Sequence, residues 1–244
     1  MGVESKFYII PQASSLRPSP QKVLDLIVAL RSKAFLCDPK AVSFAPDVHG
    51  MNNGGESFTW TTGSRREKGQ GSLDDLLAFL VTHCDSDVLL RWTNSDLARS
   101  GLKYPLTILP ESDEVYYDID FHLVAETAYH TSEVIEPFHA IRCACGAEIA
   151  ELKPDDSDPF YCARLPVMCM KCHKPNEYEN LSMTYRDPWT GEEKEGFGGV
   201  TYRFAVVVDC GKNYPDRTAQ VAADFLGIIQ RTLGVKTREI RDVY

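Results

Sequence analysis

Apolar and polar positions recur with two different periods along the chain, and each change of period marks a new element. Residues 6–11 are a short apolar run of the kind that forms a buried strand. Residues 19–35 place apolar side chains three and four positions apart, which predicts an amphipathic helix. Ser19 is a favoured N-cap residue and Pro20 suits the first helical position. The first elements are therefore predicted to be a strand and a helix.

Four more elements are predicted before residue 95. They are strands over residues 41–45 and 57–63, a helix over residues 72–84 and a strand over residues 87–93. Ser72 and Asp75 have capping-box spacing, and a polar loop rich in Gly and Asn begins at His49. The resulting order, β-α-β-β-α-β, is that of a ferredoxin-like unit.

The second half of the chain is richer in strands. Residues 114–132 alternate strictly, and residues 180–186 and 199–210 are predicted to be the two arms of a hairpin across a Gly-rich loop. A helix over residues 218–234 and a closing strand over residues 236–244 complete the chain. We predict an α+β fold with a mostly antiparallel sheet, packed helices and a ferredoxin-like N-terminal half.

Four of the eight cysteines form two closely spaced pairs. Cys143 and Cys145 have CxC spacing and a following Gly146, whereas Cys169 and Cys172 have CxxC spacing. Two sulfurs from one tight turn can face one ion, and four thiolates complete the closed tetrahedral shell of a structural zinc site. We predict that these four cysteines bind Zn²⁺.

This pattern resembles a zinc ribbon over about residues 140–175, although CxC replaces the usual first CxxC. The cysteine segment interrupts a strand-rich region, so we predict an inserted module, residues 139–176, within an α+β body formed by residues 1–138 and 177–244. A division of that body into residues 1–100 and 101–244 stays open. Cys162, His139 and His173 are nearby substitutes for one of the four ligands.

Disulfides and redox chemistry are the alternatives for these thiols. Neither a signal peptide nor an apolar run of about 20 residues is found, so we expect a cytoplasmic protein, in which disulfides are rare. A redox CxxC would open a helix in a thioredoxin-like setting, whereas Cys172 is followed by His-Lys-Pro.

Charge argues against nucleic acid and membranes as partners. The chain has 26 Lys and Arg against 35 Asp and Glu, a net charge of −9, and acidic residues also outnumber basic ones around the cysteine pairs. A phosphate backbone or an anionic membrane requires a basic face. Nucleic-acid binding through the ribbon is kept as a further alternative.

The best candidate for catalysis is one face of the alternating strand. Asp118, Asp120 and His122 share it, with Glu126 further along, and two carboxylates with an imidazole suit Mg²⁺ or Mn²⁺ in phosphoryl chemistry. The simpler interpretation is the solvent-facing side of a half-buried strand. No phosphate-binding glycine loop accompanies these residues.

Two further features have competing interpretations. Cys210 follows a strand and, without a base partner in the sequence, is predicted to be a core thiol rather than a nucleophile. Trp189 and Phe197, in the Gly-rich loop, either anchor a protein partner or cover the sheet. We therefore expect a zinc-containing protein that acts by protein–protein contact, for example like a toxin-immunity protein; the alternative is a metal-dependent enzyme using Asp118, Asp120 and His122.

Overall fold

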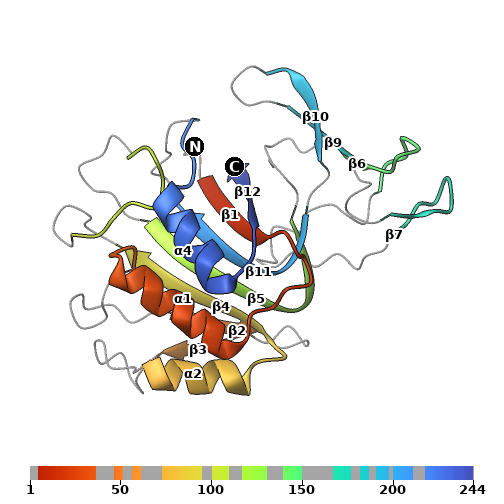
Figure 1. Cartoon of the computed structure of the whole chain (residues 1–244). Coiled ribbons are helices and arrows are strands. Elements are labelled where there is room, and N and C mark those ends of the chain that lie inside the picture. Colours follow the sequence, from red (N-terminus) through yellow and green to blue (C-terminus); the bar gives the residue numbers. More distant parts are fainter. Residues whose placement is uncertain are drawn as a thin grey trace.

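The computed structural model defines the arrangement of helices and strands (Figure 1). It describes residues 5–36, 47–51, 57–61, 73–94, 101–109, 117–130, 140–149, 167–176, 182–186, 191–197, 200–210 and 218–243.

One seven-stranded sheet forms the centre of the molecule, in the order β12-β1-β11-β5-β4-β2-β3. Every neighbouring pair in it is antiparallel. Its strands are β1 (Ser5–Pro11), β2 (Asp47–Met51), β3 (Ser57–Thr61), β4 (Asp87–Asn94), β5 (Tyr117–His130), β11 (Val200–Asp209) and β12 (Thr237–Val243). Together with the helices, this sheet confirms the predicted α+β class.

In the described part of the chain, three helices cover one face of this sheet (Figure 1). They are α1 (Pro20–Ser32), α2 (Leu73–Thr82) and α4 (Ala223–Leu233). The side chain of Ser19 accepts a hydrogen bond from the Lys22 N–H, and Gly234 ends α4 with φ +72°, as their residue types predict. The main core lies between these helices and the sheet and includes Leu26, Ile119 and Phe225. No helix among the described segments is long and apolar enough to cross a membrane.

The ferredoxin-like arrangement predicted for the first half is not confirmed. The six elements occur in the predicted order, but a self-contained βαββαβ unit would keep its four strands side by side. Here β1 pairs with β11 and β12, and β11 and β5 separate it from β4. Strands from the second half of the chain thus complete the sheet.

The second strand also differs from its prediction. β2 occupies Asp47–Met51, where the polar loop was expected to begin, and the predicted strand over residues 41–45 lies outside the described residues. β2 pairs with β3 on one side and β4 on the other. This ladder on both sides outweighs the low strand propensity of a segment that contains Gly50.

The predicted hairpin between residues 180–186 and 199–210 is wrong. β9 (Ser182–Arg186) pairs with β10 (Glu193–Phe197), a strand that the sequence assigned to the loop. β11 pairs with β1 and β5 in the large sheet. Its residues from Phe204 to Val208 are all buried, and such a run requires a central strand with both faces covered.

Among the described residues, five short strands follow β5 and precede β11 in the sequence. β6 (Ala140–Arg142), β9 and β10 form a three-stranded sheet in the order β10-β9-β6. β7 (Val167–Met168) and β8 (Pro175–Asn176) form a two-stranded sheet. β7 lies well apart from the helices and the large sheet (Figure 1). The cysteine pairs belong to this part of the chain.

Candidate metal centre

The four predicted cysteines converge on one point. One ligand atom from each of Cys143, Cys145, Cys169 and Cys172 lies within 4.8 Å of the other three. The Cys143 and Cys172 sulfurs are 3.7 Å apart, and those of Cys145 and Cys169 are 3.6 Å apart. These separations are far above the disulfide bond length of about 2 Å, so all four are free thiols. The cluster could hold a metal ion.

The first cysteine turn, residues 142–148, is closed by backbone bonds. The Cys143 N–H donates to the Ala147 carbonyl at 2.8 Å, and the Gly146 N–H donates to the Cys143 carbonyl at 2.7 Å. Arg142 and Glu148 form a β-bridge at its base. Gly146 has φ +80°, a conformation that L side chains rarely adopt. The glycine therefore lets the chain reverse directly after the second cysteine.

The second cysteine turn, residues 168–175, repeats this design with one more residue. The Cys169 N–H donates to the Lys174 carbonyl at 3.0 Å, and the His173 N–H donates to the Cys169 carbonyl at 2.8 Å. His173 stands where Gly146 stands in the first turn and has φ +55°. Both closing bonds span one residue more than in the first turn. CxC and CxxC are thus the short and long forms of one turn.

Backbone donors favour a thiolate in the second turn. The N–H groups of Cys172 and then Lys171 donate to the Cys169 sulfur and, against the effect of burial, lower the pKa of Cys169 to about 6. The Lys174 N–H acts in the same direction on Cys172, but burial and the neighbouring sulfurs outweigh it and raise the pKa of Cys172 to about 11. Protons shared among close thiols are those that a cation displaces on binding.

The three substitute ligands have different outcomes. His173 is exposed and is not part of the sulfur cluster, so its backbone conformation is its evident contribution. Cys162 and His139 lie outside the described residues.

Asp118, Asp120 and His122 do lie on one face of β5, as their alternation predicts. The interpretation of this face as solvent-facing is wrong, however, because Asp120 is only 2% and His122 only 5% exposed. A second, smaller apolar cluster shares this face of the sheet and includes Tyr8, Val124 and Val207. The side chain of Glu126 lies outside the described part.

An arginine from the neighbouring strand holds Asp120. Arg91 lies opposite Asp120 in the register of β4 and β5, and its Nε and Nη2 donate to the two carboxylate oxygens at 2.9 and 2.7 Å. Burial raises the pKa of Asp120, and Arg91 opposes that shift. The hydrogen bond with Asp120 in turn raises the pKa of Arg91. This contact engages both Asp120 oxygens and neutralises the charge that would attract a metal cation.

His122 joins the same polar network. Its Nε2 lies 4.0 Å from an Asp120 oxygen, and its Nδ1 lies 3.2 Å from the Tyr202 hydroxyl. Within the part of the chain that the structure describes, the cysteine cluster is the only group of three or more His, Cys, Asp and Glu residues placed to hold a metal ion.

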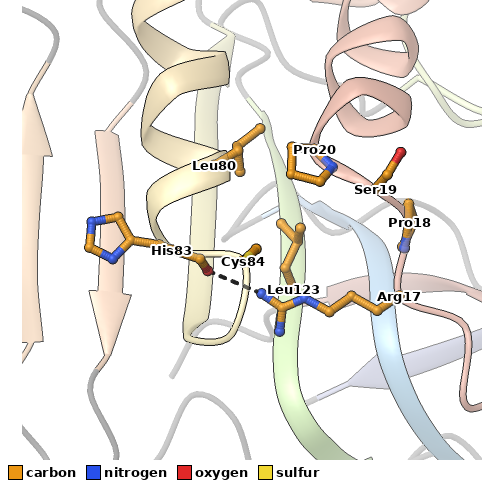
Figure 2. A pocket seen from close by; sticks show the side chains of 8 residues that line it. All are labelled: Arg17, Pro18, Ser19, Pro20, Leu80, His83, Cys84 and Leu123. Atoms are coloured by element: carbon orange, nitrogen blue, oxygen red, sulfur yellow. Dashed lines mark hydrogen bonds between the residues drawn. The ribbon is translucent and has the colours of Figure 1, made fainter.

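A small pocket of about 190 Å³ opens between the start of α1 and the end of α2 (Figure 2). Arg17 lines it, and its Nη2 donates to the carbonyl oxygens of His83 at 3.3 Å and Ser86 at 2.7 Å. The ring of His83 points away from the other lining side chains (Figure 2). Arg17 therefore ties the chain beyond the C-terminus of α2 to the segment before α1, which is a structural task.

The remaining candidates have no catalytic setting. Cys210 is buried beneath Tyr104, whose hydroxyl donates to its sulfur at 3.6 Å, and burial raises the pKa of Cys210 to about 12. The prediction of a core thiol is confirmed. Trp189 lies outside the described residues, and Phe197 is the last residue of β10.

No protein family, curated protein or solved structure matches this chain. Sequence reasoning found the four cysteines but missed Arg91 and the role of His173. The signal for Arg91 is a single charge inside the apolar run of β4, and it points to a buried partner without naming one.

Proposed function

We propose that this chain is a zinc-containing protein that acts by binding another protein and not by catalysis. The convergence of four cysteines from two turns is the observation that carries the proposal. Four sulfur ligands would saturate a tetrahedral ion and leave no position for a substrate, which is the property of a structural site.

Zinc fits the sulfur spacing. A tetrahedral ion with Zn–S bonds of about 2.3 Å separates its ligands by about 3.8 Å. The Cys145–Cys169 and Cys143–Cys172 sulfur separations, 3.6 and 3.7 Å, lie close to that edge length. A reducing compartment such as the cytoplasm would keep these thiols available.

The metal would join two turns that have little other structure of their own. β7 and β8 have two residues each, too few to build an apolar core. We therefore keep the zinc-ribbon-like module over residues 139–176 as an insertion in a body of residues 1–138 and 177–244. The pairing of β1 with β11 and β12 supports treating that body as one unit.

Protein binding is preferred because the competing functions have less support. The enzymatic alternative needs Asp118, Asp120 and His122 for a metal, whereas Asp120 is engaged by Arg91. The nucleic-acid alternative needs a basic surface, whereas the net charge is −9. A protein that neutralises a toxin is one example of the preferred class.

Metal content per chain tests the proposal and its enzymatic rival together. Protein purified without chelator or tag-derived metal would be measured by mass spectrometry as wild type, as Asp118→Asn with Asp120→Asn, and as Cys169→Ser with Cys172→Ser. We expect one zinc in the first two proteins and none in the third. A second metal in the wild type that disappears in the aspartate variant would establish the rival. If the double aspartate variant does not fold, Asp118→Asn alone replaces it, because this single substitution leaves the Arg91–Asp120 pair intact.

A further inference from the structure

Two methionines are exposed on either side of a buried cysteine. Met168 is 52% exposed and Met170 is 79% exposed, while Cys169 between them faces the sulfur cluster. Met168 is the last residue of β7 and Met170 lies in the turn itself, and both side chains face solvent while Cys169 faces the other sulfurs. The four sulfurs thereby determine which side chains the turn displays.

The same turn carries two lysines and no carboxylate. Lys171, His173 and Lys174 are exposed, and no acidic residue occurs between residues 167 and 176. This contrasts with the net charge of −9 for the whole chain. We call the five side chains of Met168, Met170, Lys171, His173 and Lys174 the second-turn patch.

The patch stands on a preorganised base. The turn is closed by two backbone bonds at Cys169 and by the β7–β8 pair, and the proposed zinc would fix it further. β7 lies well apart from the large sheet, so a partner could approach it without meeting the helices (Figure 1). Side chains held on a rigid turn lose less conformational entropy on binding than side chains on a mobile loop.

We propose that the second-turn patch is the docking surface for an acidic protein partner. The two lysines would attract its carboxylates, and the two thioethers would enter an apolar pocket between them. Methionine is adaptable and apolar, which suits a protein surface, whereas a nucleic-acid site would offer stacking aromatics and more cations. The inference rests on the proposed function and names the partner's chemistry.

The test uses the full zinc-loaded chain and a random 12-residue peptide library displayed on phage. Selected peptides would be synthesised and their affinity measured by fluorescence anisotropy for the wild type and four double variants. Two variants change the patch, Met168→Ser with Met170→Ser and Lys171→Glu with Lys174→Glu. Their matched controls change other exposed residues, Val81→Ser with Leu109→Ser and Lys33→Glu with Lys236→Glu. Zinc content is measured for each protein, and a random 12-nucleotide RNA is titrated in parallel.

We expect selected peptides rich in Asp or Glu and in large apolar residues. Each patch variant should bind them about tenfold more weakly, while both controls bind like the wild type and all five proteins retain one zinc. Selected peptides without acidic residues, or equal losses of peptide affinity in the controls, would overturn the inference. Neither result would contradict the proposed zinc site. Tighter binding of the RNA would overturn it in favour of nucleic acid. A wild type without zinc would instead remove the proposed function itself.

Discussion

The residues that follow each cysteine pair, Gly146 and His173, determine whether the two turns can form. Both have positive φ, +80° and +55°. Glycine adopts such a conformation freely, whereas a residue with a Cβ loses about 1–2 kcal/mol. His is among the side chains that tolerate it best, together with Asn and Asp. His173 therefore serves the turn through its backbone.

Replacing each of these two residues separately distinguishes a backbone role from a role as metal ligand. His173→Gly should leave the zinc affinity unchanged or slightly higher, because it removes strain without removing a ligand. Gly146→Val should lower it about tenfold, since valine resists positive φ. Competition with a chromophoric chelator measures both affinities. If His173→Gly lost zinc, the imidazole would be a ligand and the four-cysteine shell would be incomplete.

At the scale of elements, the pairing of β4 with β5 places the buried carboxylate of Asp120 beside the charged side chain of Arg91. Arg91 binds Asp120 directly and lies 3.6 Å from an oxygen of Asp118. On the other side of β5, Asp209 on β11 lies opposite Asp118 and pairs with Lys6 at 3.5 Å. Arg91 and Lys6 thus lie among three carboxylates, two of which the sequence offers as a metal site.

Arg91→Gln should destabilise the fold by about 2–4 kcal/mol, because it leaves the buried Asp120 carboxylate without its counter-charge. The loss should grow with pH. Burial already raises the pKa of Asp120, and removing Arg91 raises that pKa further. The folded variant then holds a proton that the unfolded chain releases above about pH 4, so its stability falls as the pH increases.

Urea unfolding of the wild type and Arg91→Gln at about pH 4.5 and pH 8 measures this dependence. The control is Lys103→Gln, which removes an exposed ion pair with Asp224 and should cost about 0–1 kcal/mol at both values. An equal loss at the two pH values would show that Asp120 stays ionised and is solvated in another way.

At the scale of the whole molecule, the large sheet and the cysteine turns depend on different interactions. The core under the helices contains none of the four clustered cysteines. The sheet joins β1 to β11 and β12, so segments from both ends of the sequence hold it together. The cysteine turns lack such support, because the strands that close the second turn have two residues each.

Removing zinc should therefore loosen the turns and spare the sheet. We expect chelator, or Cys172→Ser, to increase proteolytic cleavage between residues 140 and 176 by about tenfold or more, since local opening of this region then costs little. The thermal transition of the remaining fold should stay within a few degrees of the wild type. Limited proteolysis with mass mapping and circular dichroism report the two effects. Simultaneous loss of all structure would show one cooperative unit.

Local patterns determined the parts of this protein that depend on near neighbours in the chain. Ser19 and Pro20 specified the start of α1, Gly234 specified the end of α4, and the spacing of the four cysteines specified the sulfur cluster. At the two helix ends the interacting groups are near neighbours in the chain. The two cysteine pairs are distant from each other, but each pair lies within one turn and both could bind the same metal ion.

Only the tertiary structure decided which distant segments lie side by side. The sequence shows that β11 is apolar on both faces, but several partners would satisfy that requirement, so its place between β1 and β5 had to be observed. Alternation likewise placed Asp120 on one face of β5 without telling whether water or Arg91 faces it. The periodicity of a strand determines which side chains share a face of that strand. The choice of partner depends on burial and charge summed over the whole sheet, which no single segment contains.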